Sequence, residues 1–211
     1  MRARTFYIFG DSISFGQYVS VHKTWGALIS SKLAQDPQYS DVLTQVTAVN
    51  GETSKQALQR IEFCVLHHQP TVVWAQFGLN DANYWSTDMG GPRIEPDEYV
   101  DNMLSIARQC LANGTSTVIL ATNHPVSKEI PHVHKDAYRD NARLFNSVLR
   151  VAVASTNHPG IQLLDMESTF RNQETPNGHL LADGVHLSEV GHIHYFAHSC
   201  DFVKATLRAI A

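Results

Sequence analysis

The chain has 211 residues, of which 43% are hydrophobic and 17% charged, and its formal net charge is −4. It contains no cluster of Lys and Arg, no long polar tract and no apolar run of membrane-spanning length. These features argue against a nucleic-acid partner and against stable insertion in a membrane, and they leave the oligomeric state open. We expect a single domain over residues 1–211 with a substantial core.

The N-terminus leads almost directly into the first predicted strand, and no apolar signal segment with a cleavage site is visible. The three cysteines, Cys64, Cys110 and Cys200, are odd in number, far apart and placed in predicted helices. Small buried thiols are the ordinary interpretation of such residues. The sequence therefore predicts a reduced, cytoplasmic protein.

Apolar runs bounded by turn residues predict five strands, over residues 5–9, 42–49, 71–77, 118–121 and 161–164. Helical spacing of apolar residues predicts helices over 24–33, 54–68, 97–113, 136–155 and 189–210, with Thr24 and Ser188 as caps of the first and last. Strands and helices alternate along the whole chain, which calls for a parallel sheet with helices on both faces. We predict a three-layer α/β/α sandwich with a flavodoxin-like sheet of five parallel strands.

Polar residues and glycines follow the first three predicted strands. Ser12, Gly51 and Asn80 each lie just past a strand end, and Asp183 and His186 precede the last helix. Because the carboxyl ends of parallel strands share one edge of the sheet, we expect these five residues to converge there. Four of them are also common in ordinary turns, and His186 could simply cap or pack near the last helix. It is their joint pattern that favours catalysis.

This set of residues suits acyl transfer. A serine needs a base to take its proton as it attacks a carbonyl, and a histidine such as His186 can be that base. Asp183 would fix the imidazole tautomer and stabilise the imidazolium. The backbone N–H groups of Ser12 and Gly51 and the side-chain amide of Asn80 could form an oxyanion hole. No cofactor is expected.

The chain resembles the SGNH hydrolases, also called GDSL esterases and lipases. The family's four motifs are matched, in order, by Gly10-Asp11-Ser12, Asn50-Gly51-Glu52-Thr53, Gly78-Leu79-Asn80-Asp81 and Asp183-Gly184-Val185-His186. The resemblance covers nearly the whole chain and implies a flavodoxin-like sandwich. It also implies Ser12 as nucleophile, His186 as base with Asp183 as partner, and Gly51 and Asn80 as oxyanion donors. The second motif departs from the common pattern, in which Asn and Gly are further apart.

Aromatic residues and histidines outside these motifs supply further candidates. Tyr84 and Trp85 follow the third motif, and they either line a substrate pocket or pin their loop to the body of the protein. His124, after the fourth strand, is a candidate substrate contact. His132 and His134 alternate in a loop, and His194 and His198 lie one helical turn apart. The second spacing can bind zinc but lacks the Glu of a His-Glu-x-x-His motif and an evident third ligand, so no metal site is predicted.

The leading hypothesis is a serine esterase that hydrolyses small acyl or O-acetyl groups, some of them on carbohydrate, through an acyl-enzyme on Ser12. Lysophospholipase, thioesterase and acyltransferase reactions on the same triad are alternatives. Two further hypotheses are a carbohydrate-binding protein without turnover and a metal-dependent hydrolase. In each case the partner is a small molecule.

Overall fold

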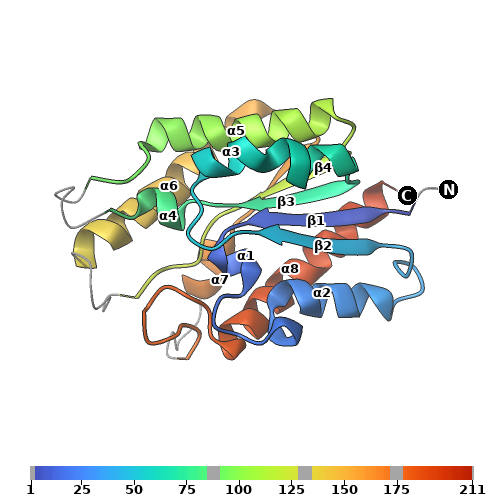
Figure 1. The fold of residues 1–211 in the computed structure, drawn as a ribbon, viewed down its shortest axis with the longest axis horizontal. Helices are drawn as coiled ribbons and strands as arrows, with labels where there is room; N and C mark the ends of the chain where they lie inside the picture. Colours follow the sequence, from blue (N-terminus) through green and yellow to red (C-terminus); the bar gives the residue numbers. More distant parts are fainter. Residues whose placement is uncertain (1–2, 85–90, 128–134, 172–177, 211) are drawn as a thin grey trace.

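A sheet of five parallel strands runs through the centre of the molecule, in the order β2-β1-β3-β4-β5 (Figure 1). The computed structural model describes residues 3–84, 91–127, 135–171 and 178–210. The strands are β1 (Thr5–Gly10), β2 (Leu43–Ala48), β3 (Val72–Gln76), β4 (Thr117–Ala121) and β5 (Ile161–Leu164). Each lies within two residues of its predicted bounds, and the flavodoxin-like order is confirmed.

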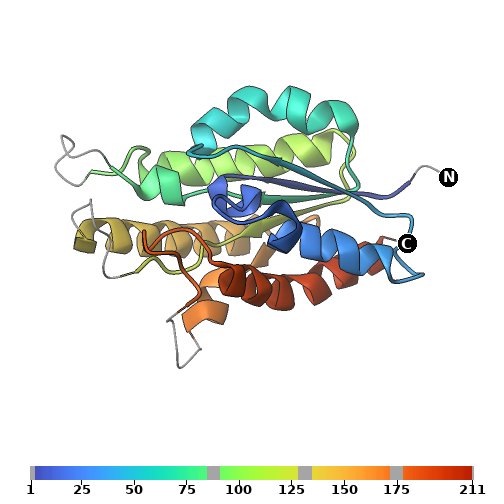
Figure 2. The same ribbon diagram turned by 60° about the horizontal axis from the view of Figure 1, so that its bottom comes forward.

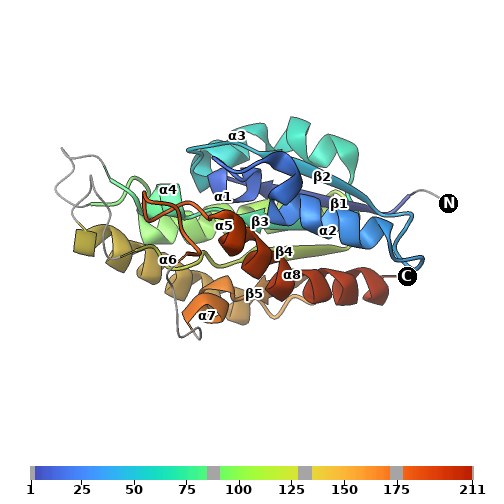
Figure 3. The ribbon, with the colours of Figure 1, turned by 90° about the horizontal axis from the view of Figure 1, so that it is seen from below.

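Helices cover both faces of this sheet, which confirms the three-layer sandwich. On one face lie α3 (Ser54–Cys64), α5 (Pro96–Ala112) and α6 (Lys135–Thr156), and on the other lie α2 (Trp25–Ala34) and α8 (Glu189–Ala209) (Figure 2). Figure 3 shows α8 running beside α2, with the short helix α7 (Met166–Arg171) next to it. The caps at Thr24 and Ser188 are confirmed, since each side chain accepts a backbone N–H from the first turn of its helix.

The core is built on the central strands, whose side chains are buried on both faces. Every residue of β3 and β4 is buried, as expected of apolar runs between two layers of helices. Trp25 and Trp74 are fully buried and pack together with Tyr195 at ring-centroid distances of 4.9–6.0 Å. This aromatic cluster fixes α2 and α8 against the sheet.

The predicted helix over 54–68 is interrupted. The α-helix α3 ends at Cys64, Val65 leaves the helical region at a φ of −133°, and a 3-10 turn, η2 (Leu66–His68), follows. Pro70 accounts for the end of helical structure at His68, because a proline disfavours helical geometry in the residue before it, here Gln69.

Four short elements escaped prediction because they span no more than six residues and show no readable periodicity. They are α1 (Ser12–Phe15), η1 (Val21–Lys23), α4 (Leu79–Ala82) and α7. Two of them carry site residues, since Ser12 begins α1 and Asn80 lies in α4.

None of the helices in the described ranges is long and apolar enough to cross a membrane. Cys110 and Cys200 are buried and Cys64 is half-buried, and all three thiols are free. The single domain and the cytoplasmic location stay predictions.

Candidate active site

Ser12 is delivered by a sharp turn at the end of β1. A Cβ on Gly10 would lie 2.3 Å from Ser14 Oγ and 2.9 Å from the carbonyl oxygen of Gln76, so only glycine lets α1 fold back so closely. Asp11 caps α1, with its Oδ1 accepting the N–H of Ile13 at 3.0 Å. Asp11 therefore supports the loop that presents Ser12.

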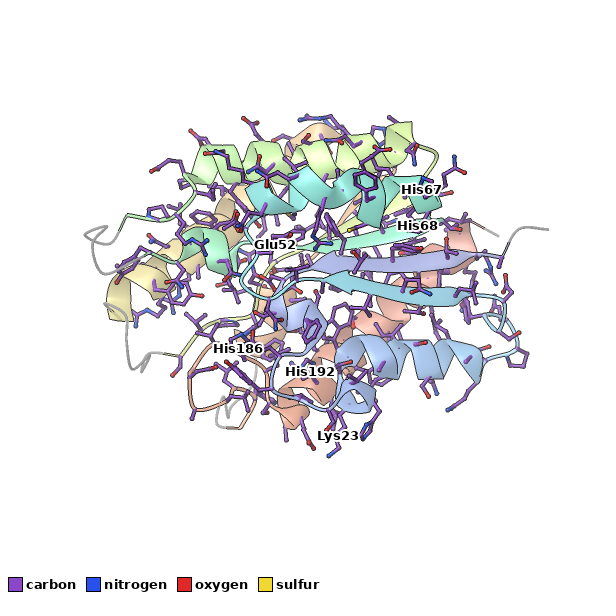
Figure 4. The ribbon with its side chains drawn as sticks, viewed as in Figure 1. Lys23, Glu52, His67, His68, His186 and His192 are labelled. Atoms are coloured by element: carbon purple, nitrogen blue, oxygen red, sulfur yellow. The ribbon has the colours of Figure 1, made fainter. Side chains whose placement is uncertain are left out.

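Asp183 and His186 lie on a hairpin that precedes α8. An antiparallel bridge between Leu180 and Leu187 closes this hairpin, and the N–H of Ser127, after β4, donates to the carbonyl of Gly184 at 2.8 Å. The hairpin is thus fastened both to itself and to the β4 edge of the sheet. Figure 4 shows His186 near α1, far from His67 and His68 at the other end of the strands (Figure 4).

Ser12, His186 and Asp183 form a continuous chain of hydrogen bonds. His186 Nε2 lies 3.0 Å from Ser12 Oγ, and His186 Nδ1 lies 2.7 Å from Asp183 Oδ2. A carboxylate can only accept, so Nδ1 carries the proton and the lone pair of Nε2 faces the hydroxyl. The arrangement allows His186 to take the proton of Ser12.

The surroundings of Asp183 favour its charged form. Partial burial opposes ionisation, but the N–H of Val185, the ring of His186 and the N–H of His186 all donate to the carboxylate. These hydrogen bonds outweigh the burial and hold the pKa of Asp183 below its ordinary value of 3.8. Asp183 is therefore an anion across the neutral pH range.

The side-chain amide of Asn80 lies at the same edge of the sheet and is fully engaged. Its Nδ2 donates to the carbonyl of Glu52 at 3.1 Å and, over a longer distance of 3.4 Å, to Asp11 Oδ2. An amide nitrogen has two hydrogens, so an oxyanion would have to replace one of these acceptors. The longer contact, to Asp11, is the weaker of the two.

Gly51 lies in a tight turn after β2. The N–H of Glu52 reaches the carbonyl of Val49 at 3.4 Å, and Gly51 sits at the third position of this turn with a φ of +77°. A positive φ at the third position of a turn favours glycine, so the turn by itself explains the choice of residue at position 51. The role of Gly51 as an oxyanion donor stays a prediction.

A buried network of hydrogen bonds holds α4 in place against α3 and α5. Asp81, the neighbour of Asn80, accepts the N–H of Ser54 through both carboxylate oxygens, at 3.0 and 3.1 Å, and also accepts its hydroxyl. Asn102 in turn donates to Ser54 Oγ at 3.0 Å. We call Asp11, Ser54, Asn80, Asp81 and Asn102 the polar floor of the site.

The carboxyls of the polar floor hold their protons more tightly than usual. Burial raises the pKa of Asp11 to about 7, with the charges of Asp81 and Glu52 adding to the effect. Burial likewise raises the pKa of Asp81 to about 6, against the hydrogen bonds from Ser54. The polar floor and Asp183 thus differ in the direction of their pKa shifts.

The further candidates from the sequence lie inside the protein or outside the described ranges. Tyr84 is 5% exposed within the hydrophobic core, and His124 is fully buried with its Nε2 2.7 Å from the carbonyl of Val185. Burial lowers the pKa of His124 to about 4, so the ring is neutral and donates through Nε2. Trp85 lies outside the described residues. Contact of these side chains with substrate stays a prediction.

Three histidine rings form a cluster beside Phe170. The rings of His179, His194 and His198 pack with centroid distances of 4.8 and 4.3 Å, beside Phe170. Across the part of the chain that the structure describes, no three side chains of His, Cys, Asp or Glu are placed to hold a metal ion. The histidines at positions 132 and 134 lie outside that part.

Two features near Ser12 were missed in the sequence. Tyr18 packs edge-on against His186, with ring centroids 5.3 Å apart, and Glu52 presents its carbonyl to Asn80. Asn80 and Glu52 both belong to recognised motifs, so their proximity was foreseeable. Tyr18 lies in an irregular loop that gives no periodic signal.

A parallel sandwich that brings a serine, a histidine and an aspartate together beyond its strands is the arrangement of α/β/α ester hydrolases. Residues 8–193 match the GDSL-like lipase/acylhydrolase family. The chain belongs to this family and is a hydrolase acting on ester bonds, as its four motifs indicate.

Similar proteins agree with this assignment. The GDSL esterase/lipase CPRD49 of Arabidopsis thaliana is 28% identical over 87% of this chain and 72% of its own. A lipase/acylhydrolase from Enterococcus faecalis has the same fold, with a TM-score of 0.78 and 22% identity over 96% of both chains. Axe2, an acetylxylan esterase from Geobacillus stearothermophilus, aligns with a TM-score of 0.73 and 20% identity over 100% of this chain and 97% of its own.

Proposed function

We propose that this ester hydrolase is a serine esterase that removes small acyl groups, above all O-acetyl groups on carbohydrate, through an acyl-enzyme on Ser12. The observation that carries the proposal is the chain of hydrogen bonds from Ser12 through His186 to Asp183, with distances of 3.0 and 2.7 Å. The acetyl group and the carbohydrate are supported by the likeness to an acetylxylan esterase.

In the first half-reaction, Ser12 Oγ attacks the ester carbonyl while its proton moves to His186 Nε2. The oxyanion that forms is stabilised by the backbone N–H of Ser12, the N–H of Gly51 and the amide of Asn80. Ser12 is the first residue of α1, where a backbone N–H has no partner within the helix. The intermediate collapses as His186 gives the proton to the departing alkoxide, which leaves as the alcohol.

The second half-reaction repeats these steps with water. His186 takes a proton from water as its oxygen attacks the acyl-Ser12 carbonyl, and then returns a proton to Ser12 Oγ as the carboxylic acid departs. Asp183 keeps the ring in the required tautomer and stabilises the imidazolium throughout.

Labelling with a fluorophosphonate tests the nucleophile, because only an activated serine reacts quickly. We expect one label on Ser12, and loss of esterase activity by about 10⁴-fold or more in Ser12→Ala. Full activity in Ser12→Ala would refute the mechanism.

A substrate panel then tests the acyl group. We expect O-acetylated sugars and p-nitrophenyl acetate to react faster than long-chain esters, lysophospholipids or acyl thioesters. A preference for any of the latter three would contradict the proposed substrate. Transfer of acetyl to an added alcohol, in preference to water, would identify an acyltransferase.

A further inference from the structure

Tyr18 is an exposed aromatic residue fastened beside the catalytic pair. The residue is 73% exposed, and its ring stands edge-on to His186, at a centroid distance of 5.3 Å and an interplanar angle of 86°. The residue lies in the loop that follows α1, six positions after Ser12.

The backbone holds this ring at a conformational cost. The N–H of Val19 donates to the carbonyl of Gly16 at 3.1 Å, which closes a turn with Tyr18 at its third position and a φ of +68°. That position favours glycine, and a bulky residue there is strained. The N–H groups of Gly16 and Gln17 both donate to the carbonyl of Ser12, at 2.9 and 3.1 Å, so the turn is tied to the proposed nucleophile itself.

The position of Tyr18 places it near the alcohol moiety of an ester substrate. His186 Nε2 must pass its proton to the departing alkoxide, so the alcohol moiety lies within hydrogen-bond distance of this ring. The carbonyl oxygen of the ester, by contrast, is directed toward the proposed donors at Ser12, Gly51 and Asn80. We therefore expect a ring that packs against His186 to border the alcohol moiety.

We propose that Tyr18 is a specificity-determining residue that packs against a ring-shaped alcohol moiety, such as the face of a sugar ring or an aryl group. The proposal rests on the proposed acyl-enzyme mechanism. Aromatic side chains offer a large, rigid apolar surface, and their pairwise contacts correspond to about a 3- to 10-fold effect on binding. The strained turn keeps this surface in place without a covering side chain.

The test compares two acetate esters that differ only in the alcohol, phenyl acetate and ethyl acetate. Both form the same acetyl-enzyme, so an effect on the alcohol appears in kcat/KM, which reports acylation. In Tyr18→Gly we expect kcat/KM for phenyl acetate to fall 3- to 10-fold and that for ethyl acetate to stay unchanged. Tyr18→Phe should keep the preference for phenyl acetate. An acetylated pyranose in place of phenyl acetate shows whether a sugar ring is favoured in the same way.

In Tyr18→Gly the relief of strain at the positive φ offsets the entropy that glycine adds to the unfolded chain, so we expect its Tm to stay close to that of the wild type. Val21→Ala, at a residue that is 79% exposed at the start of η1, three positions after Tyr18, is the matched control and should leave the ratio of the two esters unchanged. An equal fall for both esters, or an effect that follows acyl length, would overturn the proposal. Wild-type labelling of Ser12 by a fluorophosphonate would then still stand, which separates this failure from failure of the mechanism.

Discussion

Asp183 and Asp11 are two carboxylates of the same site in opposite surroundings. Asp183 stands on the hairpin with 39% of its side chain exposed, and backbone and imidazole donors hold its pKa below 3.8. Asp11 is fully buried, and burial raises its pKa to about 7. Hydrogen-bond donors directed at a carboxylate offset desolvation at Asp183 and fail to do so at Asp11.

The opposite pKa shifts indicate that Asp183 and Asp11 have different roles in the site. Asp183 is ionised at neutral pH, as is required of a group that stabilises an imidazolium. Among the described residues, Asp11 accepts the N–H of Ile13 and the long contact from Asn80, and near pH 7 it is partly protonated. Asp11 instead supports the turn that presents Ser12, through its hydrogen bond from the N–H of Ile13 in the first turn of α1.

Among variants that test the contrast between Asp183 and Asp11, removing the charge of Asp183 should have the largest effect on activity. In Asp183→Asn, the carboxamide can direct its NH2 toward His186 Nδ1 and so select the wrong tautomer of the ring. We expect kcat for p-nitrophenyl acetate at pH 7.5 to fall by about 10⁴-fold with little change in KM. Circular dichroism should show an unchanged fold, and a loss below 10-fold would mean that the hairpin positions His186 without the carboxylate.

Asp11→Asn should remove a pH dependence of stability. The folded state binds the Asp11 proton more tightly than the unfolded state. The resulting contribution of Asp11 to the free energy of unfolding is fully present below pH 3.8 and is lost as pH rises through about 7. The rise of the pKa from 3.8 to about 7 corresponds to about 4 kcal/mol over that range. Asparagine also serves as an N-cap, so α1 should persist.

Urea unfolding at pH values from 4 to 8 measures this effect. The free energy of unfolding of the wild type, minus that of Asp11→Asn, should decrease steadily between pH 4 and 7. Asp183→Asn is the control, because the lowered pKa of Asp183 places its own loss of stability below pH 4. If the wild type and Asp11→Asn give parallel curves, Asp11 is not protonated in the folded protein near neutral pH.

The same two regions differ in how far the sequence predicts them. The hairpin is local, with Asp183 bound to the N–H groups of Val185 and His186 within three residues, and its motif could be read directly. Strand alternation also predicted which edge of the sheet receives Ser12 and Asn80.

The polar floor joins residues far apart in the chain. Asp11 and Asn80 are 69 positions apart, and Ser54 and Asn102 are 48 apart. Such contacts depend on the exact register of packed elements, which no local pattern encodes. Tyr18 was missed for another reason, since a tyrosine at a positive φ contradicts the turn preferences from which we predicted loops.

The smallest expected effect belongs to Gly51, and it decides between two explanations of that residue. A Cβ on Gly51 or on Gly114 would have nothing within 4 Å, and both residues have a positive φ, +77° and +95°. Alanine at either position should therefore cost backbone strain alone, about 1–2 kcal/mol. Gly114 follows α5 after its cap and is not part of the site, so Gly114→Ala is the matched control.

If the N–H of Gly51 contributes to the oxyanion hole, strain in its turn displaces that donor. We expect Gly51→Ala and Gly114→Ala to lower Tm by similar amounts, and only Gly51→Ala to lower kcat, by about 10-fold, a fraction of the effect of losing a donor outright. Equal kcat in both variants would assign Gly51 to the turn alone and leave the oxyanion hole to Ser12 and Asn80. Asn80 would then be the one proposed oxyanion donor that is a side chain held from the polar floor, since its amide is positioned by the carbonyl of Glu52 and by Asp11.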